Sequence, residues 1–129
     1  MALQRVRFRV DFEDWCSVGE GKITLLEAVC RCGSISQAAR DLGMSYRRAW
    51  LLIRSLNLSF DTTVVAAREG GNHGGGASLT RFGHERVRAF RELESELRTV
   101  TTRRMRTIAG PIMRSRRTRK VQALDVQRE

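Results

Sequence analysis

Apolar and charged residues alternate near the amino terminus, which is the pattern of a strand with one buried face. Between residues 5 and 12 every second side chain is apolar, and the side chains between them carry charge. A period of two residues is typical of a half-buried strand. We therefore expect an edge strand over residues 5–12, with an apolar side formed by Val6, Phe8, Val10 and Phe12.

Helical spacing replaces this alternation after Gly21. Apolar residues recur as far as Gly33, and a glycine ends a helix well because it adopts left-handed backbone angles without strain. Ser34 stands three residues before Gln37, so its oxygen can cap the Gln37 amide while the glutamine side chain reaches back. These signals predict one helix ending near Gly33 and a short second helix starting after Ser34.

A third helix is expected close behind the second, because Gly43 ends the second helix and Ser45 can cap the next. Two helices joined by so short a turn must cross sharply. The apolar side chains of the third helix share one face at a period of 3.6 residues, and they are Ala49, Leu52, Ile53 and Leu56.

Strand signals return in the segment TTVVAARE, residues 62–69, which is rich in β-branched residues. The run GGNHGGG follows, so we expect a strand, a flexible glycine loop and a second short strand. Thr80 can then cap a long helix, which Pro111 ends near Gly110. Apolar residues at spacings of three and four form a stripe on this helix that needs a partner: Val87, Phe90, Leu93, Leu97 and Val100.

The chain is long enough for one domain and too short for two independent cores. No acidic residue occurs between Leu97 and Leu124, whereas arginines accumulate there. We expect a single domain over residues 1–100 and a mobile basic tail over residues 101–129.

The formal net charge of +10 favours a polyanionic partner, either nucleic acid or an acidic membrane surface. Arginine makes up 22 of the 24 basic residues, a bias that genome composition alone can produce, so the position of the charge is more informative than its sum. No apolar stretch approaches the roughly 20 residues that span a bilayer, and no signal peptide precedes the strand. The sequence predicts a soluble, cytoplasmic protein.

The three cysteines are an odd number and do not form a disulfide framework. Cys30 and Cys32 point to different faces of the first expected helix, so we interpret them as buried thiols and not as metal ligands. Acidic residues and histidines do not converge on any motif. We therefore expect no metal, no cofactor and no enzymatic activity.

The second and third expected helices have the features of a helix-turn-helix. This motif requires a small residue in its first helix and a glycine in the turn, and Ala39 and Gly43 meet both needs. The outward face of the third helix is polar, aromatic and cationic, and a helix of this kind fits the major groove of DNA. An αα-hairpin of an unrelated bundle would share the small residue and the glycine. Trp50 is expected to close the core beside Ala49 and Ile53.

The glycine loop is best interpreted as a wing. It lacks the lysine and Ser/Thr of a phosphate-binding P-loop, and it lies between two strands where that motif requires a following helix. Small residues let a backbone approach phosphates or enter the minor groove, with Asn72 and His73 as polar contacts. A metal-binding role for His73 is the weaker alternative, because no cluster of metal ligands accompanies it.

Three motifs together resemble the amino-terminal winged-helix domain of the molybdate-responsive ModE regulators, which are akin to LysR-type DNA readers. These motifs are the capped helix GSISQ, the helix opening SYxxAW and the wing GGxxGGGAxLT. The similarity extends over residues 23–97. It implies a mainly α fold with a small β-wing, that is, a winged helix-turn-helix with a long C-terminal dimerisation helix.

The resemblance also implies a homodimer that binds an inverted-repeat operator on double-stranded DNA. The positions that match the family's reading motif are Ser45, Tyr46 and Arg47, with Ser36 and Gln37 near phosphate and residues 70–76 as the wing. The predicted DNA contacts are Ser36, Gln37, Ser45, Tyr46, Arg47, Arg48, Arg54, Asn72 and His73, and the predicted dimerisation residues are Val87, Phe90, Leu93, Leu97 and Val100.

One departure from the family concerns the sensor. Members that sense molybdate bind it in a carboxy-terminal β-barrel region, and no strand pattern follows the long helix here. The sequence thus predicts a ModE-like transcription regulator without the molybdate-binding region. The alternative is a winged-helix interaction adaptor, which uses the apolar stripe to join a separate oxyanion-sensing protein.

Overall fold

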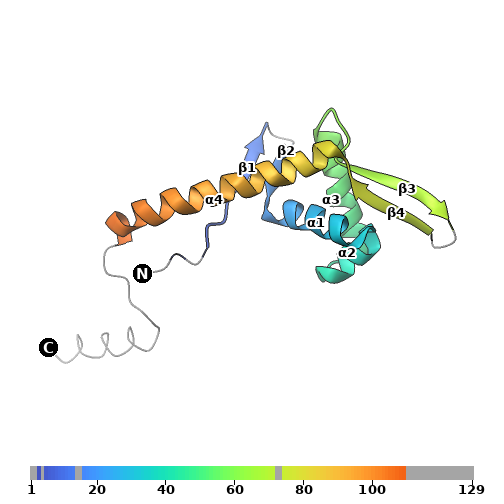
Figure 1. The fold of residues 1–129 in the computed structure, drawn as a ribbon, viewed down its shortest axis with the longest axis horizontal. Helices are drawn as coiled ribbons and strands as arrows, with labels where there is room; N and C mark the ends of the chain where they lie inside the picture. Colours follow the sequence, from blue (N-terminus) through green and yellow to red (C-terminus); the bar gives the residue numbers. More distant parts are fainter. Residues whose placement is uncertain (1–2, 4, 14–15, 72–73, 110–129) are drawn as a thin grey trace, which may run out of the picture. The chain divides into compact units, whose positions relative to one another are not determined.

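A computed structural model describes the backbone of residues 3, 5–13, 16–71 and 74–109. The chain divides into two compact units, the larger being Arg7–Leu93 and the smaller combining Met1–Val6 with Glu94–Glu129. Figure 1 shows the order of the elements: β1 (Arg9–Phe12), β2 (Cys16–Gly19), α1 (Glu20–Cys32), α2 (Ile35–Asp41), α3 (Tyr46–Ser59), β3 (Val65–Gly71), β4 (Gly74–Leu79) and α4 (Arg81–Ala109).

The core of the larger unit is centred on α1, against which α2, α3 and β4 pack. Leu25, Ala28 and Val29 of α1 are completely buried. Alanines at the positions where α2 and α3 meet the core let the helix axes approach closely. The buried apolar side chains of this core come from α1, α2 and α3, from the β3–β4 hairpin and from α4.

The helix boundaries follow the capping signals. Gly33 ends α1 in the left-handed conformation, with a φ of 71°, and its amide donates to the Val29 carbonyl. The Ser34 hydroxyl oxygen accepts from the Gln37 amide at 3.0 Å, and the Ser45 hydroxyl oxygen accepts from the Arg48 amide at 3.1 Å. The predicted end of α1 at Gly33 and the predicted caps of α2 at Ser34 and of α3 at Ser45 are therefore confirmed.

The first strand is shorter than the alternation predicted, and it has a partner that the sequence did not reveal. β1 pairs with β2 in an antiparallel hairpin in which Arg9 lies opposite Gly19 and Phe12 opposite Cys16. β2 has only four residues, too few for a periodicity to be recognised. Phe12, which was placed on the buried side, is 51% exposed.

The wing is an antiparallel hairpin that extends away from the three helices (Figure 1). The expectation of a flexible loop over the whole glycine run is wrong: β3 continues to Gly71 and β4 starts at Gly74, so ladder pairing extends into the glycines, with a register irregularity after Arg68. Glycine has a low strand propensity by itself, but neighbouring strands supply its hydrogen bonds.

Two contacts attach the wing to the helices. The Asn57 side chain accepts hydrogen bonds from the amides of Val64 and Val65 and donates to the Val65 carbonyl. The Ala77 amide donates to the Gly33 carbonyl at 2.9 Å. The start of β3 is thereby held on α3 and β4 on the turn between α1 and α2.

α4 begins as predicted, because the Thr80 hydroxyl oxygen accepts from the Gly83 amide at 3.0 Å. Within the larger unit, Phe90 of α4 is buried and its ring stacks on that of Phe8 with centroids 4.6 Å apart. Arg91 donates to the carboxylates of Glu20 and Glu27 on α1. These hydrogen bonds, first of all that to Glu27, raise the pKa of Arg91.

α4 continues into the smaller unit and ends at Ala109, as the sequence predicted from Pro111. In that unit, Arg98 donates to the Leu3 carbonyl at 3.4 Å. The predicted mobile tail lies outside the described residues from 110 onward, whereas residues 101–109 are helical. None of the helices in the described parts of the chain is both long and apolar enough to cross a membrane.

The cysteines agree only in part with the expectation of buried thiols. Cys16 is buried and Cys32 half-buried, but Cys30 is exposed. The cause is the orientation of α1, whose buried face is occupied by Ala28 and Val29 and which turns Cys30 towards solvent.

Candidate nucleic-acid interface

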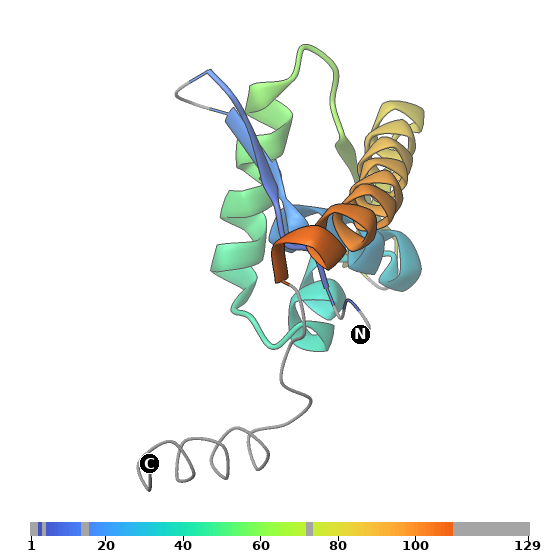
Figure 2. The ribbon, with the colours of Figure 1, turned by 90° about the vertical axis from the view of Figure 1, so that its left-hand side faces the viewer.

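The connection between α2 and α3 has the geometry that a helix-turn-helix requires. Ala39 is 2% exposed, so at this position α2 packs against its neighbours with only a methyl side chain. Gly43 adopts a φ of 66°, and the Met44 amide donates to the Ala39 carbonyl at 3.0 Å. The turn therefore closes on the backbone of α2 and sets the direction in which α3 leaves it, as Figure 2 shows.

α3 has one face in the core and the opposite face in solvent. Ala49, Ile53 and Leu56 are buried. The predicted contacts Tyr46, Arg47, Arg48 and Arg54 are all exposed, and Ser45 is exposed at the amino terminus. Because the first amides of a helix carry partial positive charge, this end of α3 favours anions beyond what its arginines contribute.

α2 contributes a second group of predicted contacts. Ser36 and Gln37 are exposed in its first turn. The backbone amide of Gln37 donates to the Ser34 hydroxyl, and the Gln37 residue is exposed. The remaining two predicted contacts, Asn72 and His73 of the wing, lie outside the described residues.

The expectation that Trp50 closes the core is wrong. Trp50 is 40% exposed, and the guanidinium carbon of Arg54 lies 5.3 Å from the centroid of its ring. The small side chain of Ala49 fills the core position instead, since Ala49 is completely buried. The Trp50 indole therefore joins the exposed cationic face of α3.

Sequence reasoning missed two leucines on this face. Leu51 is 47% exposed and Leu58 is 72% exposed. A signal was present, because Leu51 stands four residues after Arg47 and three before Arg54, the spacings that share a helix face. Neither leucine was assigned to a face from the sequence.

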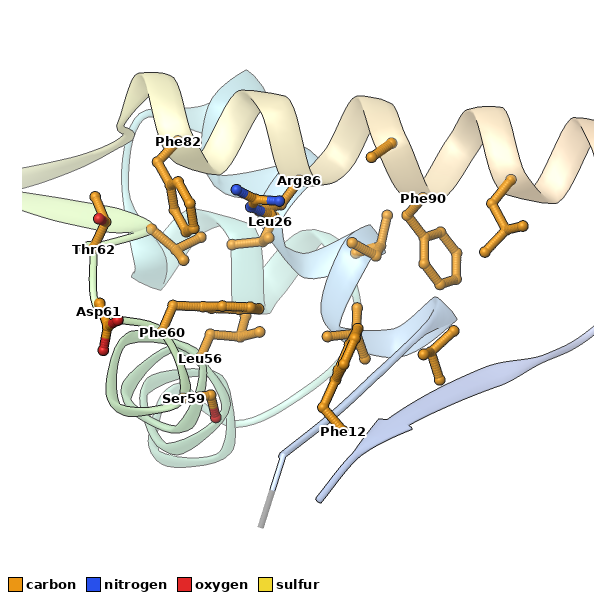
Figure 3. A pocket seen from close by; sticks show the side chains of 16 residues that line it. Phe12, Leu26, Leu56, Ser59, Phe60, Asp61, Thr62, Phe82, Arg86 and Phe90 are labelled. Carbon is orange, nitrogen blue, oxygen red and sulfur yellow. The ribbon is translucent and has the colours of Figure 1, made fainter. Parts of the chain in front are cut away.

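A second surface of the larger unit is an open apolar groove of about 690 Å³ (Figure 3). Its walls come from the β1–β2 hairpin, α1, the end of α3 and the first part of α4. The Phe60 and Phe82 rings meet edge to face, with their centroids 5.6 Å apart. The guanidinium carbon of Arg86 lies 3.9 Å from the centroid of the Phe82 ring. Four phenylalanines line the groove: Phe12, Phe60, Phe82 and Phe90.

The predicted dimerisation stripe is divided by the structure. Val87 packs against the core of its own unit and Phe90 is buried in it, whereas Leu93 is exposed at the edge of the groove. In the smaller unit, Leu97 is half-buried and Val100 is exposed. Only part of the stripe is thus accessible in the described chain.

The described residues offer no group of three His, Cys, Asp or Glu side chains that could hold a metal ion. The exposed chemistry of the larger unit is instead cationic and aromatic on α3 and apolar in the groove. The face of α3 suits binding of a polyanion, and the groove suits binding of an apolar partner.

Comparison with known families gives a match over residues 21–84 to the bacterial regulatory helix-turn-helix protein, lysR family. Among curated proteins, the chain is 42% identical over 80 residues to the molybdenum-pterin-binding protein MopA of Rhodobacter capsulatus, a match covering 62% of this chain and 30% of that protein. It is 35% identical over 97 residues to the molybdenum transport protein ModE of Azotobacter vinelandii, covering 75% and 36%.

The DNA-binding transcriptional dual regulator ModE of Escherichia coli K12 is 41% identical over 69 residues, which cover 54% of this chain and 26% of that protein. The chain therefore spans only about a third of the length of these relatives. The matches confirm the resemblance to the amino-terminal part of ModE proteins that the three motifs indicated.

Solved structures agree on the fold. The crystal structure of the CbnR DBD–DNA complex matches with a TM-score of 0.51 and 22% identity, over 69% of this chain and 95% of that one. Full-length CbnR complexed with its target DNA matches with a TM-score of 0.50 and 21% identity, over 67% and 28%. The predicted winged helix-turn-helix with a small β-wing and a long final helix is confirmed.

Proposed function

Because residues 21–84 match the helix-turn-helix of the lysR family of bacterial regulatory proteins, we propose that this chain binds double-stranded DNA with sequence preference and regulates transcription. The observation that carries this proposal is the exposed face of α3, which combines a capped amino terminus with three arginines. A face of this kind fits a major groove about 12 Å wide. Relatives named as transcription regulators support it.

In this proposal the two kinds of contact have different tasks. Tyr46 and Arg47 lie in the first turn of α3, where side chains of a reading helix reach base edges. Ser36 and Gln37 at the start of α2, together with Arg48 and Arg54, bind backbone phosphates. Asn72 and His73 of the wing add contacts beside the groove.

We further propose that the DNA-bound form is a homodimer, so that each α3 reads one half of an inverted repeat. The open groove supports a homodimer, because about 690 Å³ of mostly apolar space is bounded by exposed Phe12 and Leu93. Large apolar side chains left exposed around a groove mark an interaction site. The domain formed by residues 1–100 supplies these contacts, and the basic tail of residues 101–129 adds phosphate contacts.

The same groove favours a second candidate function, an interaction adaptor that joins a separate oxyanion-sensing protein. The two functions differ in their dependence on DNA sequence. An adaptor would bind selected and random duplexes equally, whereas a regulator would prefer one sequence by a factor of at least 10³.

The test is selection of bound fragments from genomic DNA by the full chain at fixed salt, with and without molybdate. We expect a palindromic preferred sequence. The arm with molybdate measures whether the oxyanion changes the affinity of this chain for DNA. Enrichment of no sequence would overturn the regulator and leave the adaptor.

A further inference from the structure

We propose that Leu51 is a specificity-determining residue, whose exposed side chain reads the methyl group of a thymine in the major groove. This inference rests on the proposed function, since it assigns a task to one more residue of the same face of α3. Leu51 is absent from the contacts that the sequence predicted, and its side chain is 47% exposed.

The position of Leu51 on α3 is the first part of the argument. At 3.6 residues per turn, Leu51 lies about 200° around the helix from buried Ala49, which points it directly away from the core. It is five residues after Tyr46, or about 7.5 Å along the axis, and so within the first two turns. Side chains of these turns reach base edges when a recognition helix occupies the major groove.

The neighbours of Leu51 are the second part. Arg47 lies one turn before it and Arg54 one turn after it on the same face, and both are exposed. The Arg54 guanidinium is held beside the Trp50 ring at 5.3 Å. An apolar side chain between two cations suits a duplex, which offers phosphates on both sides of the groove and an apolar group on its floor.

The chemistry of the floor supplies the ligand. Thymine is the unmodified base that presents an apolar C5-methyl group in the major groove, and aliphatic side chains contact this group. Contact removes both apolar surfaces from water. Burial of one methyl group changes an equilibrium constant by about fourfold, which sets the expected size of the effect in each half-site.

Leu58 is the natural comparison. It is more exposed than Leu51, at 72%, but it lies seven residues further on, about 10.5 Å along the axis. Leu58 is therefore in the last turn of α3, where a helix has left the base edges. A protein partner could contact both leucines as one surface. A DNA partner would contact Leu51 at the base edges and would leave Leu58 outside the groove.

The experiment uses the full chain and the preferred duplex obtained by selection. Each thymine is replaced in turn by uracil, which removes only the methyl group, and affinities are measured at fixed salt for wild type, Leu51→Ala and Leu58→Ala. At one thymine of each half-site, we expect uracil to weaken wild type and Leu58→Ala about fourfold and Leu51→Ala less than twofold. Thermal unfolding checks that both variants retain the fold.

A second variant tests the same contact by a gain of preference. Glutamine has a good helix propensity and bonds adenine through its amide, so Leu51→Gln should move the preferred base at this position from thymine to adenine. Equal uracil effects in wild type and Leu51→Ala at every thymine would overturn the proposal. Absence of any uracil effect in wild type would overturn it as well. If wild type selects no sequence at all, the proposed function itself has failed.

Discussion

Arg54 lies with its guanidinium carbon 5.3 Å from the centroid of the Trp50 ring, and both side chains belong to the exposed face of α3. They are four residues apart, the spacing at which side chains of a helix meet. A cation beside an indole loses part of its freedom before any ligand arrives. The pair thus presents a positioned charge beside Leu51.

Removal of the indole should weaken DNA binding through Arg54. We expect Trp50→Ala to cost about 0.5–1 kcal/mol of binding free energy and Trp50→Phe less, since phenylalanine retains a ring face. Arg54→Ala should reduce the slope of log affinity against log salt by about 0.9, as expected for one lost phosphate contact. Affinities measured at several salt concentrations give both quantities. A Trp50→Ala cost that is unchanged in the Arg54→Ala background would show that Trp50 acts without Arg54.

Arg47 is expected to contribute to base recognition. Arg47→Ala should weaken binding to the preferred duplex by about 1–3 kcal/mol and relax the sequence preference, because a bidentate contact to a base edge is lost. Arg117→Ala, in the basic tail outside the described residues, is the control and should weaken specific and random DNA alike. Competition binding against random duplex measures both. An equal loss on the two kinds of DNA for Arg47→Ala would refute its base-reading role.

Gly83 is required by the close approach of α4 to the segment before β3. A β-carbon on Gly83 would clash with the backbone oxygen of Val64, an atom that also accepts from the Thr80 amide. We expect Gly83→Ala to lower the free energy of unfolding by about 1–3 kcal/mol, because the helix start or the strand must move.

Gly21 provides the matched control for this substitution. A β-carbon there meets nothing within 4 Å, so Gly21→Ala should raise the free energy of unfolding by about 0.5–1 kcal/mol through reduced backbone entropy. Denaturant titration of wild type and of the two variants measures these changes in the free energy of unfolding. Similar effects of both alanines would mean that the Val64 contact is not the reason for a glycine at position 83.

Arg91 should stabilise the packing of α4 on α1 at any moderate pH. Its side chain, about a third exposed, donates to Glu20 and Glu27, and we expect Arg91→Met to cost about 1–2 kcal/mol after allowance for solvent screening. The folded-state pKa of Arg91 is raised, so its contribution is complete below the unfolded pKa, itself well above the pH range of the measurement, and is lost only at still higher pH.

The stability difference between wild type and Arg91→Met should therefore be the same at pH 7 and pH 9. Arg88→Met, on an exposed position of the same helix, is the control and should be nearly neutral. Thermal denaturation at both pH values provides the measurement. A difference that vanishes at pH 9 would contradict a role for the Arg91 guanidinium.

The elements that the sequence predicted well are those whose signals are local. Ser34, Gly43 and Ser45 mark the helix ends because a cap or a left-handed turn involves only neighbouring residues. β2 was missed and the glycine loop overestimated, since whether a short segment pairs as a strand depends on the neighbouring segment and not on its own propensity alone. For the same reason the apolar groove, assembled from five elements, had no signal in the sequence.

The sequence by itself determined the order of helices and strands, the sharp turn before α3 and the cationic character of that helix, because periodicity, capping and charge are properties of short segments. Only the tertiary structure decided that the Trp50 and Leu51 side chains of α3 reach solvent beside its predicted cationic residues. Trp50 and Leu51 look like core residues by composition, yet Ala49 and Ile53 occupy the space against α1. Burial depends on how closely neighbouring elements pack, and that is set by the whole core and not by any one segment.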